Sequence, residues 1–241
     1  MRRTAGPTQT AAAPKQARAR ATRDRIFRVA GEVFAAHGFA GARVADIAQR
    51  AGGNRQRLYA YFGSKQELYR QVLIEAYAQV AQHAGLLRLG LADLPVMTGR
   101  IVECFFEIHE SNPRFWRLLC WENLNGGRSL TAADWQRLRA AYIAHLDRLY
   151  TEGQRQGVFR QDVDFTTYLL VLFSTTYFCF SNQLTISRLL GVALDSRAVR
   201  RQIEEQFVAL VERGLTAPRE QDRGAPRPPN PTPATGVNLS P

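Results

Sequence analysis

Apolar residues recur every three or four positions along most of the chain, which is the period of a helix that buries one face. No segment of the sequence shows the sustained alternation of apolar and polar residues that is typical of a half-buried strand. The pattern therefore predicts an all-α fold. The expected helices span about residues 22–37, 44–51, 55–62, 64–82, 94–110, 114–124, 131–156, 164–189 and 196–214.

The first expected helices are short and have clear start and stop signals. Gly38 follows the first helix, and Gly52-Gly53 ends the second. Asn54 precedes the third helix, where its side chain can accept a hydrogen bond from a free backbone N–H group. Ser64 and the glutamate three residues later form a capping box at the start of the fourth. Two short helices joined by a glycine-containing turn describe a helix-turn-helix, so residues 20–66 are expected to form a DNA-binding domain.

The second helix of this motif, residues 55–62, is the expected reading helix. Leu58 and Phe62 lie four positions apart and are expected to pack inward, which leaves the other side chains free to face DNA. The N-terminal residues of such a helix contact base edges in the major groove. Arginine pairs with guanine and glutamine with adenine, whereas tyrosine and lysine suit phosphate contacts. The expected DNA contacts are Asn54, Arg55, Gln56, Arg57, Tyr59, Tyr61 and Lys65.

Positive charge is concentrated in the first third of the chain. The 241 residues include 32 Lys and Arg and 21 Asp and Glu, a formal net charge of +11. Residues 1–70 hold 14 of the basic and 4 of the acidic residues, and so carry +10 of that charge. Such a segment indicates a polyanionic partner, either nucleic acid or an acidic membrane surface. Because the charge coincides with the helix-turn-helix, DNA is favoured over a merely solvated basic face.

The rest of the chain divides into three parts. Residues 1–19 are expected to form a disordered basic arm, and residues 217–241, with seven of the 11 prolines, a disordered tail. Residues 67–216 are expected to form a helical domain for ligand binding and dimerisation. Residues 165–187 of this domain carry no charge, but the many Ser, Thr, Asn and Gln side chains among them argue against a membrane span. A helix buried in a core, and against a partner chain, is the better interpretation.

Several runs of residues together resemble one protein family. They are Thr22 to Ile26, Phe34 to Phe39, Val44 to Ala48, Ala51-Gly52 and Leu58 to Leu68. Over about residues 20–75 the chain resembles the DNA-binding domain of the TetR (tetracycline-repressor-like) family. The resemblance implies a homodimer, usually a repressor, whose C-terminal domain binds a small effector and releases DNA. It implies DNA contacts at the residues named above, and Arg43, which precedes the second helix where the family often has Thr or Ser, is expected to contact a phosphate.

The second domain is rich in aromatic residues. The stretch from Asn112 to Asn123, with Gly126-Gly127-Arg128 after it, is similar to a TetR subgroup that includes pyrimidine-utilisation regulators, although no ligand follows from this. Pockets in helical bundles are mostly apolar with a few polar groups, so a small apolar or aromatic effector is expected. Plain core packing is the alternative for each side chain. The expected ligand residues are Phe105, His109, Trp116, Trp121, Tyr168, Tyr177, Phe178 and Asn182.

Other classes of protein find less support in the sequence. It has no glycine-rich nucleotide-binding motif, no GxSxG and no HExxH, so neither an enzyme nor a cofactor is expected. Cys104, Cys120 and Cys179 are widely spaced, which indicates neither a disulfide framework nor a metal site and fits a reducing cytoplasm. Two alternatives stay open: a ligand-independent or architectural DNA-binding protein that uses the arm in the minor groove, and a small-molecule binding module with an incidental basic arm.

Overall fold

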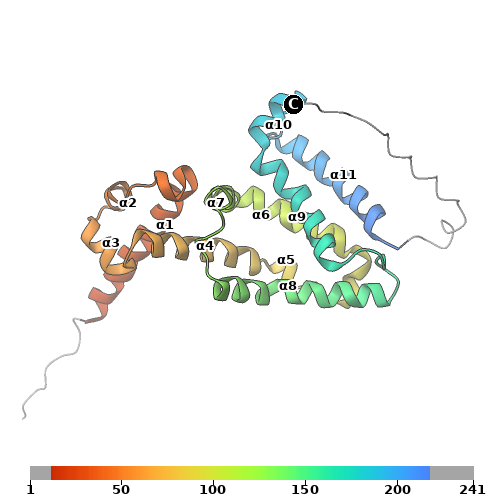
Figure 1. Cartoon of the computed structure of the whole chain (residues 1–241), viewed down its shortest axis with the longest axis horizontal. Coiled ribbons are helices and arrows are strands. Elements are labelled where there is room, and N and C mark those ends of the chain that lie inside the picture. The colour runs from red at the N-terminus through yellow and green to blue at the C-terminus, as the bar shows by residue number, and fades with distance from the viewer. Residues whose placement is uncertain (1–11, 218–241) are drawn as a thin grey trace, which may run out of the picture.

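Helices form nearly all of the described part of the chain (Figure 1). The structure is a computed structural model and describes residues 12–217. The prediction of an all-α fold is confirmed, since the only β pairing in residues 12–217 is an isolated bridge between Phe159 and Thr216. The elements are α1 (Ala12–Gly41), α2 (Val44–Arg50), α3 (Arg55–Phe62), α4 (Lys65–Ala81), α5 (Ala84–Leu87), the 3-10 helix η1 (Leu91–Val96), α6 (Met97–Ser111), α7 (Pro113–Leu124), α8 (Ala132–Arg155), α9 (Phe165–Ser181), α10 (Gln183–Leu190) and α11 (Arg197–Leu215).

The first three helices pack together with the start of α4 (Figure 1). Fully buried side chains from all four helices form their shared core, among them Ile26, Phe34, Ile47, Leu58 and Leu68. Burying one such side chain contributes about 1.5–3 kcal/mol, so this core holds α2 and α3 firmly against α1. The helix-turn-helix therefore rests on a rigid base.

The N-terminal boundary of this domain differs from the expected one. α1 begins at Ala12, so residues 12–19 of the expected disordered arm are helical and extend α1 beyond the body of the domain (Figure 1). Half of these residues are alanine and Lys15, Gln16 and Arg18 are also strong helix formers, while Pro14 falls in the first turn, where proline is tolerated. Residues 1–11 and the expected tail from residue 218 lie outside the described residues.

The second domain is a bundle in which α6 packs against both α9 and α11 (Figure 1). α4 runs from the first domain into the second, where it packs against α7 and α8. Buried side chains of α6 and α9, including Ile101, Phe105, Leu172 and Phe180, fill the space between them. Because α4 and α7 contact both domains, they are the elements that connect the bundle to the helix-turn-helix.

The longest apolar stretch forms two helices instead of the single expected helix 164–189. α9 ends at Ser181, and α10 continues from Gln183 at an angle of 81° to it. Asn182 lies between them with φ −111° and ψ 8°, which interrupts the helical backbone. Within residues 12–217 no single helix is long and apolar enough to cross a membrane. The bent pair α9–α10 meets the criteria of length and composition only when its two helices are taken together.

One buried ion pair ties α4 to α8. Arg70 donates from Nε and Nη2 to the two carboxylate oxygens of Asp134, at 2.8 and 2.7 Å. Asp134 is almost fully buried and also accepts hydrogen bonds from the backbone N–H and the hydroxyl of Thr131, at 2.9 and 2.8 Å. The Arg70 guanidinium, followed by the Thr131 donors, holds the pKa of Asp134 well below its usual range. This carboxylate is therefore charged and fully paired.

The contact between the domains centres on a break in α1. Gly38 has φ 66° and ψ −178°, a conformation that essentially only glycine adopts. The indole of Trp121, from α7, covers Gly38, and its N–H donates to the carbonyl oxygen of Ala35 at 3.2 Å. A Cβ atom at Gly38 would lie 2.6 Å from Cε3 of Trp121. α7 is thus fitted closely onto the C-terminal end of α1.

Candidate nucleic-acid interface and ligand region

Two capped helix starts hold the helix-turn-helix in shape. At the start of α3, Oδ1 of Asn54 accepts a hydrogen bond from the backbone N–H of Arg57 at 2.9 Å. At the start of α4, Oγ of Ser64 accepts one from the backbone N–H three residues later, at 3.0 Å. Each cap contributes about 1 kcal/mol to the stability of its helix. Leu58 and Phe62 are buried, so the opposite side of α3 faces solvent.

The predicted DNA contacts fall into two groups. Tyr61 is half-buried with its ring edge-on to Phe62, at 6.4 Å between centroids. Lys65 is also half-buried, its Nζ lies 4.6 Å from the ring centroid of Phe39, and burial lowers its pKa. These two residues can offer a phosphate only the polar ends of their side chains. The remaining six have exposed side chains: Arg43, Asn54, Arg55, Gln56, Arg57 and Tyr59.

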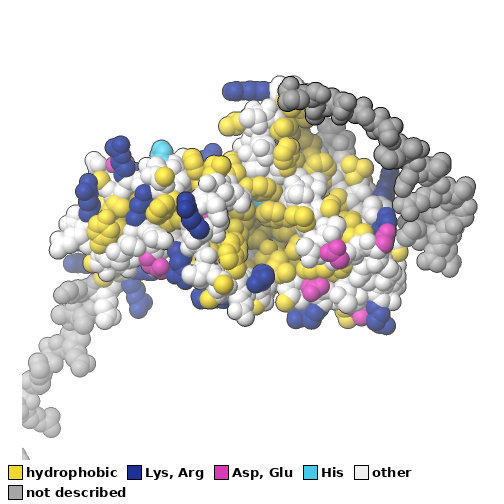
Figure 2. All heavy atoms as spheres, viewed as in Figure 1, with side chains coloured by type: hydrophobic (Ala, Val, Ile, Leu, Met, Phe, Trp, Pro, Cys, Tyr) yellow, Lys and Arg dark blue, Asp and Glu magenta, His cyan; other side chains and the backbone are white. Residues whose placement is uncertain are grey.

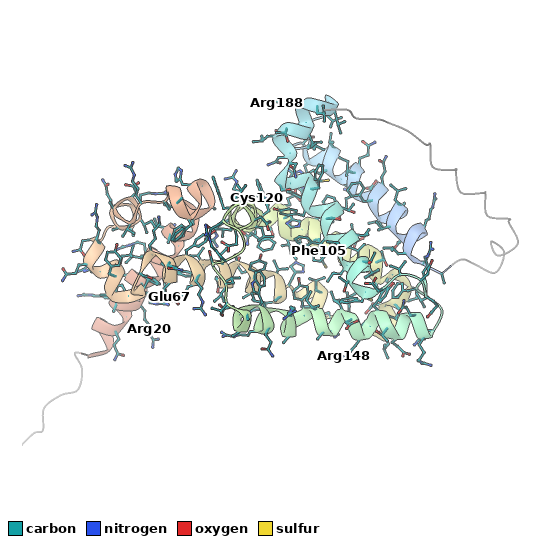
Figure 3. The ribbon with its side chains drawn as sticks, in the orientation of Figure 1. Arg20, Glu67, Phe105, Cys120, Arg148 and Arg188 are labelled. Atoms are coloured by element: carbon teal, nitrogen blue, oxygen red, sulfur yellow. The ribbon has the colours of Figure 1, made fainter. Side chains whose placement is uncertain are left out.

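Basic side chains are spread over the part of the surface formed by α1 to α3 (Figure 2). Arg18 and Arg20 are exposed on the helical extension of α1, where Figure 3 labels Arg20. The motif-based prediction did not include them, although the local excess of positive charge was a signal for this segment. Arg28 and Arg50 are also exposed, but both donate to Glu32 at 2.9 Å, so part of their charge is neutralised within the protein. Exposed positive charge therefore extends from the N-terminal part of α1 to α3.

In the second domain, aromatic rings gather around His109. The centroid of the imidazole lies 5.4–5.9 Å from the rings of Phe115, Phe173, Tyr177 and Phe180. His109 is 1% exposed, and neither ring nitrogen has a hydrogen-bond partner among the described residues. Burial lowers the pKa of His109 to about 4. The ring is therefore neutral at neutral pH, with one donor and one acceptor.

Only part of the predicted ligand set meets at this place. Phe105, which Figure 3 labels, contacts Phe173 edge-on at 5.6 Å between centroids, and Phe173 stacks on Tyr177 at 5.4 Å. Phe105, His109 and Tyr177 thus belong to one cluster. Phe173 and Phe180 complete it, although the sequence-based prediction missed them. Their spacing from Tyr177, four positions before and three after, places all three on one side of α9 and was the available signal.

The other predicted ligand residues lie elsewhere. Trp121 belongs to the contact between the domains, and Asn182 to the break between α9 and α10. Tyr168, near the start of α9, packs on Tyr150 at 4.3 Å between centroids and shares a hydrogen bond of 3.0 Å with Thr98. Trp116 is buried in α7, and Phe178 is half exposed on α9. Within residues 12–217, no ring contact or hydrogen bond joins any of these five side chains to His109.

The buried imidazole makes stability depend on pH. A free histidine titrates near pH 6.5, so between about pH 6.5 and 4 the unfolded chain binds a proton that folded His109 does not. The free energy of unfolding should therefore fall as the pH drops through this interval. In His109→Leu this fall should be smaller, because leucine binds no proton. Urea denaturation at several pH values measures the slope.

His37→Leu is the matched control, since His37 is an exposed histidine on α1. It makes the same substitution at an exposed position, so the slopes of the two variants can be compared directly. An unchanged slope in His109→Leu would contradict the prediction, because it would mean that His109 binds its proton equally well in the folded and the unfolded chain.

Comparisons with known proteins address the two domains separately. The family model described as bacterial regulatory proteins, tetR family, matches residues 26–72, and the one described as tetracyclin repressor-like, C-terminal domain, matches residues 98–211. The HTH-type transcriptional repressor NicS of Pseudomonas putida is 35% identical over 197 residues, which cover 80% of this chain and 92% of NicS. The chain belongs to the TetR family. The resemblance seen in the sequence is thereby confirmed, and the helix-turn-helix α2–α3 lies within the matched N-terminal region.

Other TetR-like proteins agree with this assignment. The HTH-type transcriptional repressor SCO4008 of Streptomyces coelicolor is 31% identical over 155 residues, or 63% of this chain and 74% of SCO4008. A TetR family transcription regulator from Marinobacter aquaeolei VT8 has the same fold, with a TM-score of 0.67 and 20% identity over 84% of this chain and all of that one. SCO4942 of Streptomyces coelicolor has a TM-score of 0.64 and 29% identity over 82% and 99% of the two chains. This TetR protein is therefore a DNA-binding transcriptional repressor and not an enzyme.

Proposed function

We propose that this repressor acts in the cytoplasm as a homodimer that binds a palindromic operator and is released from it by a small, neutral aromatic effector. The observation that carries the proposal is the outer side of α3, where Arg55, Gln56, Arg57 and Tyr59 are exposed on a helix whose inner side is fixed by the core. A two-fold dimer would set two such helices about 34–36 Å apart, one turn of DNA.

Exposed apolar side chains on α9 and α11 support the dimer. Leu170 is 63% and Phe178 50% exposed on α9, and Leu210 is 65% exposed on α11. Leu170 and Phe178 lie eight positions apart, and so on one side of the helix. Apolar stripes of this kind mark surfaces that bind other proteins. Pairing α9 and α11 with the same helices of a second chain would bury them in a four-helix bundle.

The aromatic cluster around His109 supports the effector. A buried polar group without a partner costs about 1–3 kcal/mol, so a ligand that hydrogen-bonds to His109 would gain from satisfying it. The neutral imidazole and the surrounding rings favour an uncharged aromatic molecule over an ion. Compounds that release the operator from the wild type should fail to release it from His109→Leu. If no neutral aromatic compound releases the operator, this part of the proposal is wrong.

An in vitro selection with the full chain tests operator binding and dimer symmetry together. We expect it to return a palindrome with half-site centres about one helical turn apart. A selected sequence without two-fold symmetry would contradict the dimer. Failure to enrich any sequence would contradict specific binding, and would favour an architectural DNA-binding protein.

Single substitutions separate base reading from phosphate contact. Arg57→Ala should weaken binding to the selected operator by about 1–3 kcal/mol and relax the base preference at one position. Lys65→Ala should weaken binding to the operator and to random DNA by similar factors, because a phosphate contact carries no sequence information. Gel-shift titrations on both DNAs measure the two affinities.

Arg148→Ala is the matched control. It removes the same charge from an exposed position on α8, in the second domain, where Figure 3 labels it. Its affinity for both DNAs should stay close to that of the wild type. Equal losses on operator and random DNA in Arg57→Ala would show that Arg57 does not read a base.

A further inference from the structure

A pocket of about 210 Å³ lies where the C-terminal end of α6 meets the first turns of α11. We call it the α6–α11 pocket. Its charged lining consists of Arg197, Arg200 and Arg201 from α11, with Glu204 from the same helix and Glu110 from α6. The apolar stripe proposed for the dimer, which includes Leu210, does not line it. The pocket is therefore separate from the proposed dimer surface.

The guanidinium of Arg200 is fixed in place and has one buried N–H without an acceptor. It lies over the ring of Phe180, 5.4 Å from the centroid, and Nη2 donates to the carbonyl oxygen of Asp195 at 2.9 Å. Nε is buried and has no hydrogen-bond partner among residues 12–217. The carboxylate of Glu110 is 3.8 Å from Nη2, too far for a hydrogen bond. An added carboxylate would supply the acceptor that this N–H lacks.

The acidic side of the pocket brings several carboxylates close together. Burial raises the pKa of Glu204, and the carboxylates of Glu103 and Glu110 raise it further. Negative charges crowded in this way favour a cation beside them. Arg201 partly offsets this by lowering the pKa of Glu204, but its Nε is also paired with Glu205 at 3.2 Å. An ammonium group between Glu110 and Glu204 would relieve the repulsion.

Between the two charged sides the floor of the pocket is aromatic, although its two rings are only 4% and 2% exposed. Phe106 and Phe180 both line the pocket, and their rings meet edge-on at 5.8 Å between centroids. Phe180 also packs on His109, at 5.4 Å between centroids, so the α6–α11 pocket and the aromatic cluster around His109 share this ring. The lining thus combines a guanidinium side, a carboxylate side and an aromatic floor, within a volume suited to one small molecule.

We propose that the α6–α11 pocket binds a free α-amino acid with an apolar side chain. The carboxylate of the amino acid pairs with Arg200 and Arg197, the ammonium group with Glu110 and Glu204, and the side chain lies on Phe106 and Phe180. A zwitterion meets both charged sides of the pocket at once, whereas a simple anion or cation is attracted by one side and repelled by the other. This site is additional to the proposed effector region.

Isothermal titration calorimetry on the full chain without DNA tests the proposal with three probes that share a phenyl ring on a short aliphatic chain. L-phenylalanine has both charged groups, 3-phenylpropanoate lacks the ammonium group, and phenethylamine lacks the carboxylate. We expect L-phenylalanine to bind with a Kd of about 1 mM or tighter, and each of the others at least about tenfold more weakly. Absence of L-phenylalanine binding up to about 10 mM, or equal binding of all three probes, would overturn the proposal.

Three variants locate the binding site. Arg200→Gln and Glu110→Gln should each weaken L-phenylalanine binding by about tenfold or more. Arg213→Gln is the control for Arg200→Gln. It replaces an exposed arginine by glutamine near the C-terminal end of α11, and should leave binding unchanged. Glu110 is exposed on α6, so its variant keeps the fold even if Arg200→Gln does not. Undiminished binding in Glu110→Gln would place the amino acid elsewhere and overturn the proposal.

Discussion

Replacing Asp134 by alanine should lower the free energy of unfolding by about 3 kcal/mol, because it leaves the partly buried guanidinium of Arg70 without its main partner. Removing one partner of a buried ion pair costs more than the pair contributes, since the remaining charge keeps its desolvation penalty. The substitution also removes the acceptor of the Thr131 hydroxyl and backbone N–H at the start of α8. Urea denaturation of the full chain measures the loss.

Acidification should reproduce part of this loss in the wild type. The folded pKa of Asp134 lies well below the value of about 3.9 that an aspartate has in an unfolded chain. Its contribution is therefore complete at neutral pH and decreases as the pH falls below about 4, toward the folded pKa. Asp134→Ala lacks this contribution, so the gap between variant and wild type should narrow in acid. A constant gap down to about pH 2 would contradict the assignment of the charge to Asp134.

Asp147→Ala is the control for both measurements. Asp147 lies on the same helix, α8, but is exposed. Surface substitutions of this kind usually change stability by no more than about 0.5 kcal/mol. A similar loss in Asp147→Ala would mean that α8 depends on charge in general and not on the ion pair with α4.

Local signals made the helix-turn-helix predictable. Asn54 and Ser64 cap α3 and α4 through hydrogen bonds that span three residues, so the sequence contains both partners in one short window. Leu58 and Phe62 are buried as their spacing predicts. The exposure of Arg55 and its neighbours follows from the same period. The recognition surface is therefore largely a local property of the chain.

The second domain was less predictable because its contacts join distant residues. Arg70 and Asp134 are 64 positions apart, and nothing near either residue indicates the other. Trp121 was expected in a ligand site, yet its indole packs on Gly38 of the DNA-binding domain. The helical pattern predicts that an aromatic side chain is buried, but it does not tell against which helix the side chain packs. The grouping of Phe105, His109 and Tyr177, and the separation of Tyr168 from them, depend on how α6 and α9 pack.

α7 contacts both the aromatic cluster around His109 and the DNA-binding domain. At its N-terminal end, Phe115 packs on His109, with ring centroids 5.9 Å apart. Six residues further along α7, Trp121 packs on the break in α1 at Gly38. A ligand that moves the His109 cluster would therefore act on a helix that also contacts the DNA-binding domain. Coupling of this kind requires the ligand to favour one of two placements of α7.

Gly38→Ala should disrupt this contact and lower the free energy of unfolding by about 3 kcal/mol. The backbone conformation of Gly38 is costly for any residue with a Cβ, and the new methyl group would also overlap the indole of Trp121. Gly191→Ala is a milder comparison. Gly191 has the same φ of 66° but a ψ of 28°, in the left-handed helical region, and nothing lies within 4 Å of a Cβ there, so its variant should lose only about 1 kcal/mol.

A double-mutant cycle with Trp121→Ala isolates the steric part. Trp121→Ala alone is destabilising, because it removes the packing on Gly38 and the hydrogen bond to Ala35. In Gly38→Ala/Trp121→Ala the indole is absent, so the new methyl group has room and the double variant should lose about 1–2 kcal/mol less than the sum of the single losses. Strictly additive losses would mean that the indole does not rest on Gly38 in solution, and that α7 is not held against α1 in the way the structure places it.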